Sequence, residues 1–197
     1  MGMMDFGYRF VLASNSPRRR ELLAGLGISY EVRVLRGIDE SYPDNLPTEQ
    51  VPVYISRKKA EAYAEGMADD ELVITADTIV AVDGRILGKP ADRTEAVKML
   101  RLLSGRRHQV VTGVTFTTKA RRHSFCDVTD VWFASLTDEE IGYYVDNCRP
   151  YDKAGAYGIQ EWIGYMGVER IDGSYFNVMG LPVQRLYREL TAFCAGE

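Results

Sequence analysis

The sequence contains few of the residues that bind soft metal ions or form disulfides. Its 197 residues include three cysteines, Cys126, Cys148 and Cys194, and two histidines, His108 and His123. The cysteines are odd in number and widely spaced, and no two of them form a C-x-x-C pair. Because zinc sites and disulfide frameworks need clustered or paired ligands, neither is expected.

Long apolar runs and an excess of positive charge are also missing. No stretch approaches the roughly 18 apolar residues of a membrane-spanning helix, and the N-terminus does not resemble a secretory signal. The formal net charge of −4 argues against non-specific nucleic-acid binding, which depends on neutralising many phosphates. We therefore expect a cytoplasmic protein with no membrane or nucleic-acid partner, in which any anion site is local.

The overall composition is that of a globular protein. Hydrophobic residues make up 46% of the chain and charged residues 26%, so neither disorder nor a coiled coil is indicated. No internal repeat or long linker separates independent domains. The length fits one large domain, residues 1–197, or two lobes that share a cleft.

The first half of the chain predicts alternating strands and helices. An apolar run over 10–13 predicts a strand, and Ser16 followed by Pro17 predicts the start of a helix that ends near Gly27. Alternation over 30–35 predicts a second strand. Further along, we expect a helix over 48–64, a buried strand over 72–82, and a hairpin turn over 82–85.

The second half continues this alternation. Apolar spacing predicts helices over 93–103 and 137–145, and strands over 110–118 and 126–135 flank a polar turn at 119–123. The glycine-rich segment 153–182 predicts loops and short elements, and a final helix begins near Pro182. The expected fold class is α/β, with a mixed twisted sheet and flanking helices.

Three consecutive arginines occupy the first turn of the first predicted helix. The helix dipole disfavours cations there, so Arg18, Arg19 and Arg20 call for a compensating anion. A phosphate would meet free backbone N–H groups, guanidinium groups and the hydroxyls of Ser14 and Ser16. The alternative is a solvated basic turn. Because successive helical residues point about 100° apart, Arg20 is the expected bystander.

Asp77 is an acid inside the apolar run 73–80. A carboxylate there is costly unless it is paired, hydrogen-bonded or bound to a metal ion, so a functional role is favoured over a purely structural one. The sequence leaves open whether Asp77 acts as a general base or as a metal ligand.

Four other polar residues are candidates with simpler alternatives. Lys59 lies on the apolar stripe of its helix, where it is either a ligand or a snorkelling lysine, and Lys89 is equally open. Glu40 lies in a loop, where solvation is the default. Gln160 follows a tight apolar segment and either reads a base edge or caps a loop. Neither lysine belongs to a Walker A loop.

Several segments together resemble the Maf family of nucleotide pyrophosphatases. They follow the family's order and cover the chain from about Tyr8 to Leu190. The matching segments are Ala13 to Leu23, Arg57 to Ala60, Ala76 to Thr78, Gly88 to Pro90, Thr112 to Val114, Asp152 to Gln160 and Gly173 to Tyr175.

This resemblance implies an α/β fold related to the ITPases, with two lobes around a deep cleft, often as a homodimer. It also implies hydrolysis of a nucleoside triphosphate to the monophosphate and pyrophosphate. One alternative is a nucleotide-binding regulator of cell division, because the family is also associated with inhibition of septum formation. A second alternative is a pyrophosphatase directed at 7-methyl-GTP or at purine nucleotides.

Within the family, the chain looks like the branch that acts on dTTP and UTP, with modified pyrimidine triphosphates as further candidates. Arg18, Thr78 and Gln160 match the specificity positions of that branch. Two features depart from it: Glu161 stands where glycine is common, and the segment 162–170 differs from a glycine-rich run.

The resemblance also implies roles for the candidate residues. Asp77 and Glu40 would bind a divalent cation, Mg²⁺ or Mn²⁺, and Asp77 would orient or deprotonate the attacking water. The residues expected to bind the triphosphate are Ser14, Ser16, Arg18, Arg19, Lys59 and Lys89.

Overall fold

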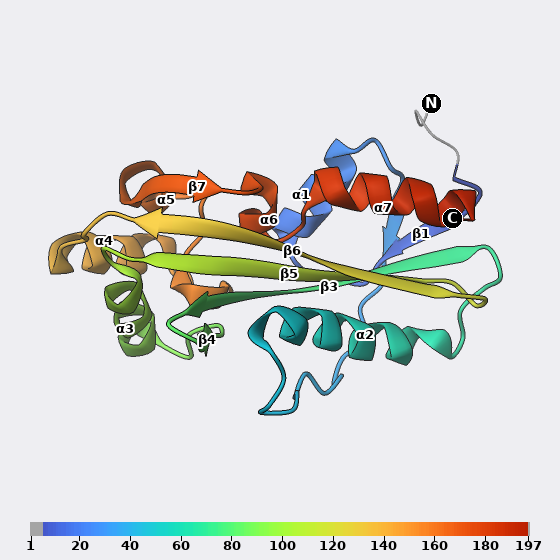
Figure 1. Cartoon of the computed structure of the whole chain (residues 1–197), viewed down its shortest axis with the longest axis horizontal. Coiled ribbons are helices and arrows are strands. Elements are labelled where there is room, and N and C mark those ends of the chain that lie inside the picture. The colour runs from blue at the N-terminus through green and yellow to red at the C-terminus, as the bar shows by residue number, and fades with distance from the viewer. Residues whose placement is uncertain (1–5, 197) are drawn as a thin grey trace. The chain divides into compact units, whose positions relative to one another are not determined.

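The computed structural model describes residues 6–196, which form a mixed seven-stranded sheet flanked by helices (Figure 1). The strands are β1 (Arg9–Leu12), β2 (Tyr30–Val32), β3 (Glu71–Val82), β4 (Arg85–Leu87), β5 (Arg107–Thr117), β6 (Arg122–Phe133) and β7 (Val168–Asp172). Their order is β2-β1-β3-β5-β6-β7, with β4 paired to β3 off this path. β1 is parallel to β2 and β3, whereas β4 and β7 pair antiparallel with β3 and β6. The predicted α/β class is confirmed.

Several helices accompany these strands within residues 6–196. They are α1 (Pro17–Gly25), α2 (Val51–Ala64), α3 (Arg93–Leu103), α4 (Asp138–Cys148), α5 (Trp162–Gly167), α6 (Tyr175–Met179) and α7 (Val183–Ala195), with short 3₁₀ turns at Thr48–Gln50 and Ala154–Ala156. Ser16 caps α1 by accepting a hydrogen bond from the N–H of Arg19, and Thr137 with Glu140 forms a capping box on α4.

The chain divides into two compact units. The first unit comprises Met1–Asp77, Thr112–Asp127 and Gly180–Glu197, and the second comprises Thr78–Val111 and Val128–Met179. β3, β5 and β6 contribute residues to both units. The deep cleft between two lobes, which the family resemblance implies, stays a prediction.

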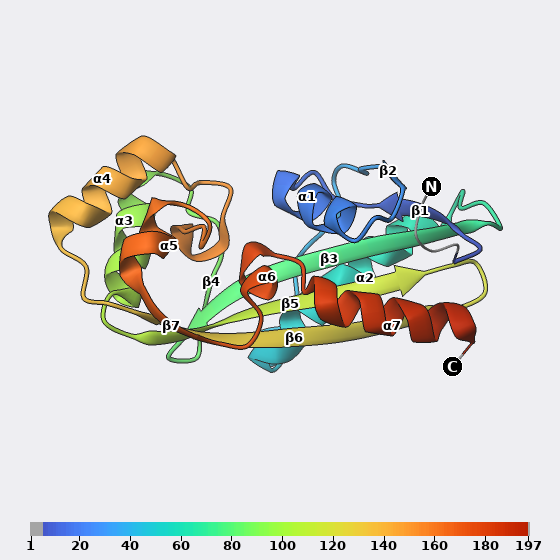
Figure 2. The ribbon, with the colours of Figure 1, turned by 90° about the horizontal axis from the view of Figure 1, so that it is seen from above.

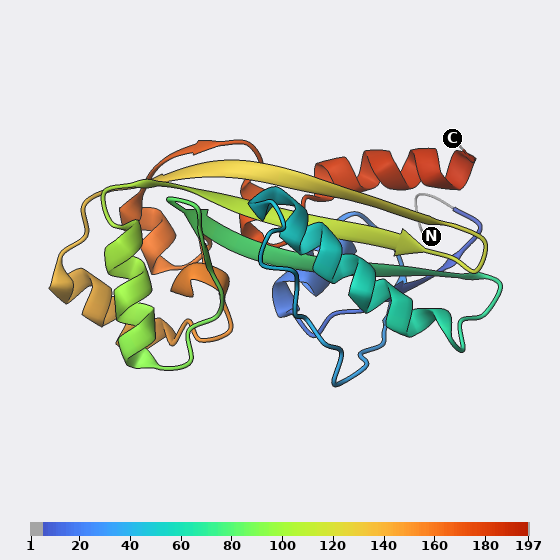
Figure 3. The ribbon, with the colours of Figure 1, turned by 60° about the horizontal axis from the view of Figure 1, so that its bottom comes forward.

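In the first unit, helices cover both faces of the strands. α2 lies on one face, and α1 and α7 lie on the other (Figures 2 and 3). Val11 and Val73, from the parallel strands β1 and β3, pack in one buried cluster with Tyr63 of α2 and with Met67. The carboxyl end of β1 therefore lies beside Ile74, near the start of β3, and the N–H of Ala13 donates to the carbonyl of Ile74 at 2.9 Å.

Two boundaries differ from the prediction for identifiable reasons. β2 ends at Val32 rather than at 35, because the Tyr63 hydroxyl donates to the Arg33 carbonyl and accepts from the Leu35 N–H in place of a strand partner. β6 begins at Arg122, inside the predicted turn. The Arg122 and His123 side chains pair with acids of flanking helices, so their polarity does not prevent strand formation.

The second unit has its own hydrophobic core. Apolar side chains of β3, β5, β6, α3 and α4 form one buried cluster, which includes the fully buried Tyr144. His108 lies in this unit with 1% of its surface exposed, 2.8 Å from the Tyr157 hydroxyl and edge-on to the ring of Phe133. Burial lowers the pKa of His108 to about 4, so the ring is neutral at pH 7.

Candidate active site

The start of α1 presents serine oxygens and backbone N–H groups at one point of the first unit. The Ser14 Oγ accepts a hydrogen bond from the Ser16 N–H at 3.2 Å, and the Ser16 Oγ accepts from the Arg19 N–H at 3.4 Å. Ser14 is buried, and Arg18 is half-buried in the first turn. Because α1 has no acid in its first turn, the positive end of the helix dipole lacks a compensating side chain from that turn.

Arg19 connects this helix to the strand that carries Asp77. Its Nη1 donates to the Ala76 carbonyl at 2.9 Å, and its Nε donates to the Gly180 carbonyl at 2.8 Å. Burial lowers the pKa of Arg19, and the nearby Asp77 carboxylate opposes that shift. Two donors of this arginine therefore serve the protein backbone, a role that the sequence did not indicate.

Lys59 brings both predicted acidic residues together. Its Nζ lies 2.8 Å from Asp77 Oδ1 and 3.2 Å from Glu40 Oε1. The side chains of Lys59 and Asp77 are each 15% exposed, whereas that of Glu40 is 58% exposed. The lysine is thus an ion-pair partner of two carboxylates rather than a snorkelling residue, and solvent reaches the cluster from the Glu40 side.

Lys58, which precedes Lys59 on α2, holds the loop that carries Glu40 against this helix. Lys58 Nζ lies 2.8 Å from Asp39 Oδ2, and Asp39 also accepts hydrogen bonds from the N–H and hydroxyl of Ser41. The hydrogen bond from Lys58 holds the pKa of the Asp39 carboxyl well below its usual range. Two consecutive lysines therefore contact two consecutive acids of this loop.

The carboxylates of Asp77 and Glu40 suit a hard divalent cation. Both supply oxygen donors, which Mg²⁺ and Mn²⁺ prefer, and both converge on one ammonium group. Within residues 6–196, no cluster of three or more histidine, cysteine, aspartate or glutamate side chains is arranged to hold a metal ion. A cation at this position would therefore need oxygen ligands from phosphate or water in addition to the two carboxylates.

The remaining predicted substrate contacts belong to the second unit. Thr78 follows Asp77 on β3 and is half-buried. Lys89 is exposed, just after β4, where the preceding Gly88 carbonyl accepts a hydrogen bond from the Gly155 N–H at 3.0 Å. Gln160 is half-buried, and its Oε1 atom is buried with no hydrogen-bond partner in the described part of the chain. In the first unit, the structure thus brings the start of α1 close to Asp77, and Asp77 and Glu40 together at Lys59. In the second unit, Thr78, Lys89 and Gln160 lie in separate segments of the chain.

These features have counterparts in known proteins. The sequence pattern of the family described as Maf-like protein matches residues 9–193. The chain belongs to the Maf family. The match includes every candidate residue considered above.

Several relatives of the chain share one name. Proteins named dTTP/UTP pyrophosphatase from Phocaeicola vulgatus, Parabacteroides distasonis and Bacteroides fragilis are 61%, 61% and 60% identical to it. These alignments cover 93–94% of this chain and 95–96% of the relatives. A solved HAM1 protein from Coxiella burnetii is 16% identical, with a TM-score of 0.45 over 93% of this chain and 98% of its own.

Sequence reasoning missed one polar network of this Maf-family chain. Lys153, which is buried, forms an ion pair with Glu161 at 3.0 Å, and the Tyr144 hydroxyl donates to the same carboxylate. The sequence marks Glu161 only as a departure from the branch that acts on dTTP and UTP. No periodic pattern marks Lys153 or Tyr144, because their contact depends on how the segment between them turns.

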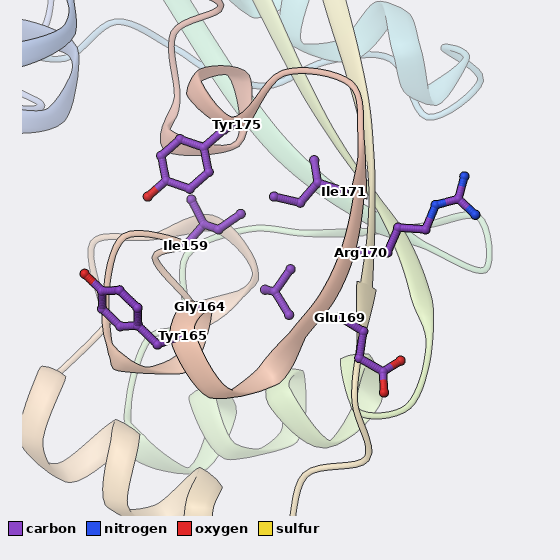
Figure 4. Close-up of a pocket in the computed structure, with 8 residues that line it drawn as sticks. Ile159, Gly164, Tyr165, Glu169, Arg170, Ile171 and Tyr175 are labelled. Carbon is purple, nitrogen blue, oxygen red and sulfur yellow. The ribbon is translucent and has the colours of Figure 1, made fainter.

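A separate pocket of about 300 Å³ lies in the second unit. Ile159, Tyr165, Ile171 and Tyr175 are among the residues that line it, and Figure 4 shows Ile159 between the two tyrosines. None of the predicted substrate-binding residues lines this pocket.

No helix within 6–196 has the length and apolar character needed to cross a membrane.

Proposed function

We propose that this chain is a nucleoside triphosphate pyrophosphatase that hydrolyses dTTP and UTP to the monophosphate and pyrophosphate. The observation that carries the proposal is the Lys59 ammonium, held by Asp77 and Glu40 in the same unit as the serine- and arginine-rich start of α1. A chain that combines an anion-binding helix start with a paired acid cluster can bind phosphates and activate water. Membership of the Maf family and the shared name of the relatives support the same activity.

The start of α1 would bind phosphate oxygens. Its backbone N–H groups, the Ser14 and Ser16 hydroxyls and the Arg18 guanidinium would spread the negative charge, while Arg19 keeps the helix connected to β3 through Ala76. Such groups accelerate phosphoryl transfer by positioning and by electrostatic stabilisation rather than by covalent chemistry.

Asp77 would orient the attacking water and accept its proton. Water attacks the α-phosphorus, the bond from that phosphorus to the oxygen bridging to the β-phosphate breaks, and pyrophosphate leaves with that oxygen. Lys59 would keep the Asp77 carboxylate in place and stabilise charge on the leaving group. Lys89 and Thr78, in the second unit, are proposed as further substrate contacts.

A divalent cation, Mg²⁺ or Mn²⁺, is proposed as the cofactor, with Asp77 and Glu40 as its protein ligands. When bound, such an ion neutralises phosphate oxygens and polarises the phosphorus centre. The carboxylates suit it, because hard cations favour oxygen ligands.

The buried Oε1 of Gln160 supports a preference for uracil and thymine. A buried acceptor without a donor is costly, and a ligand donor would remove that cost. Uracil and thymine offer an N–H donor at ring position 3, flanked by carbonyl acceptors that suit the Gln160 amide N–H₂. Cytosine has an acceptor at ring position 3, so that atom cannot donate a hydrogen bond to Oε1.

A substrate panel tests the proposal. Pyrophosphate release should be measured with Mg²⁺ or Mn²⁺ for dTTP, UTP, methylated pyrimidine triphosphates, CTP, 7-methyl-GTP and ITP. We expect dTTP and UTP to be hydrolysed with higher kcat/KM than CTP. Tight nucleotide binding without product release would support the division regulator instead, and faster hydrolysis of 7-methyl-GTP or ITP would support the purine-directed alternatives.

The cellular setting and assembly are part of the same proposal. Cys126, Cys148 and Cys194 are free thiols, which suits the reducing cytoplasm. We propose a homodimer on the basis of the family resemblance. Light scattering coupled to size-exclusion chromatography tests the dimer, because a mass near that of one 22.2 kDa chain would contradict it.

A further inference from the structure

Gln160 sits in a tight turn whose two ends are joined by a hydrogen bond. The N–H of Glu161 donates to the carbonyl of Gly158 at 2.9 Å, so Ile159 and Gln160 occupy the corner. Gly158 is enclosed: a Cβ atom at that position would lie 3.0 Å from Gln160 Nε2, from the Glu161 carboxyl carbon and from Lys153 Cε. The side chains of Gln160, Glu161 and Lys153 thus all lie next to Gly158.

Charged and hydroxyl side chains hold this turn in place. Lys153 Nζ lies 3.0 Å from Glu161 Oε1 and 2.7 Å from Asp152 Oδ1, and the lysine side chain is 9% exposed. The Tyr144 hydroxyl donates to Glu161 Oε2 and accepts from the N–H of Gly158 at 3.0 Å. Tyr144 therefore contacts both ends of the turn. Burial and the adjacent carboxylate raise the pKa of Tyr144, which keeps its hydroxyl protonated as a donor.

An ion pair that is largely shielded from water, as between Lys153 (9% exposed) and Glu161 (23% exposed), contributes little to the stability of a fold. Desolvation of both charges offsets most of their attraction, so such a pair contributes more to fixing one geometry than to stability. The apolar core of this unit already packs around Tyr144, Tyr157 and Ile159 without the charges. The cost is understandable if the corner of the turn must hold one exact arrangement.

We infer that Lys153, Glu161 and Tyr144 form a positioning network that fixes the Gly158–Glu161 turn and thereby aims the Gln160 amide at the base of the substrate. This inference rests on the proposed function, because it assigns the network to base recognition in the same reaction. It also gives a role to Glu161, the residue that departs from the pattern of the branch. The three residues are positioning residues and need not touch the nucleotide.

The experiment separates base recognition from phosphate binding. For wild type, Glu161→Gln, Lys153→Met and Tyr144→Phe, we would measure the KM for UTP and the inhibition constant of inorganic tripolyphosphate, which has no base. We expect the KM for UTP to rise roughly five- to tenfold in the variants while the inhibition constant stays within about twofold. Glu169→Gln is the matched control, because it removes an exposed acid from the same unit.

Coupling to Gln160 supplies the second readout. Gln160→Ala should raise the KM for UTP, and adding Glu161→Gln to it should cause little further change, because the network acts through that amide. Additive effects of the two substitutions would overturn the inference. Parallel changes in the KM for UTP and in the tripolyphosphate constant would also overturn it, since they indicate a general structural role.

Separate control measurements distinguish a variant that does not fold from a chain that has no activity. Thermal unfolding identifies a variant that does not fold; if Lys153→Met fails, the conservative Glu161→Gln and Tyr144→Phe decide. A wild-type chain that releases no pyrophosphate contradicts the proposed function, and calorimetric binding of UTP and tripolyphosphate then replaces the kinetic constants. A variant that loses affinity for UTP alone still supports the network, and equal affinities in wild type and variants would overturn it.

Discussion

The guanidinium of Arg19 donates to the backbone carbonyl of Ala76 at 2.9 Å, and Ala76 directly precedes Asp77. The same side chain donates to the Gly180 carbonyl, so one arginine connects α1, β3 and the segment before α7. An arginine can do this because its donors point in several fixed directions, whereas a lysine has one flexible ammonium group. The start of α1, which is proposed to bind phosphate, and Asp77, which is proposed to activate water, are therefore connected through one side chain.

Arg19→Lys should lower kcat by about tenfold or more with a smaller change in KM, because Asp77 loses its fixed backbone position. Steady-state pyrophosphate release for UTP measures both constants. Arg18→Ala is the comparison, since loss of a phosphate contact should raise KM and lower kcat together. Unchanged kcat in Arg19→Lys would contradict the link between α1 and Asp77.

Asp77→Asn should reduce turnover at least about 100-fold, because an amide cannot accept the proton of the attacking water. Nucleotide binding should remain measurable by calorimetry, since the start of α1 is unchanged. Asp44→Asn, an exposed acid in a loop of the same unit, is the control and should keep wild-type turnover. Near-normal turnover of Asp77→Asn would remove this residue from the reaction.

Lys59→Met and Lys58→Met form a matched pair of neighbouring substitutions on α2. Lys59→Met should lower kcat/KM for UTP by roughly 10- to 100-fold, because Asp77 and Glu40 both lose the ammonium group with which they form ion pairs. Lys58→Met should change it by less than about threefold, because it removes an ion pair with the exposed Asp39 and a hydrogen bond to the Ser41 carbonyl, but no contact with Asp77 or Glu40. Equal losses of kcat/KM in the two variants would show that both lysines act by holding the loop that carries Asp39 and Glu40, and not by pairing with Asp77.

His108 should make the protein less stable as the pH falls from 6.5 to about 4. In this window the unfolded chain binds a proton that the folded chain excludes, so protonation favours unfolding. The loss approaches about 3 kcal/mol near pH 4 and is absent above pH 7. Urea unfolding of wild type and His108→Gln at pH 8, 6 and 5 measures it. The variant should show a shallower decline, and equal slopes would contradict the assignment to His108.

Gly113→Ala should destabilise the fold by at least about 2 kcal/mol, because β5 approaches the first turn of α2 at this residue. An added Cβ would lie 2.3 Å from the Pro52 carbonyl carbon and from the Val53 nitrogen. Gly25→Ala is the matched control: its Cβ meets nothing within 4 Å, and the change should stay within about 1 kcal/mol. Similar unfolding midpoints for both variants would contradict the close approach.

The sequence predicts elements well where local chemistry decides them. Ser16 and Pro17 define the start of α1, and Thr137 with Glu140 defines the start of α4. It fails where a distant side chain substitutes for a local partner, as when Tyr63 takes over the backbone groups beyond Val32. Local patterns carry no information about such contacts.

The same limit applies to the site. The apolar setting of Asp77 indicated a paired or functional acid, and the helical stripe placed Lys59 on a buried face. That these two residues contact one another follows from the packing of α2 on β3, which periodicity cannot specify. The bridging role of Arg19 and the contact between Lys153 and Glu161 are likewise products of tertiary structure.

The first unit is assembled from three separate stretches of chain, and the last of them starts at Gly180. During synthesis, Asp77 and Arg19 leave the ribosome long before the carbonyl that Arg19 also contacts. At roughly 5–20 residues per second, the intervening stretch takes several seconds or more to emerge. α1 and Asp77 are therefore not fully secured in a nascent chain, and a ribosome stalled before Gly180 would carry a chain that lacks the hydrogen bond from Arg19 to the Gly180 carbonyl.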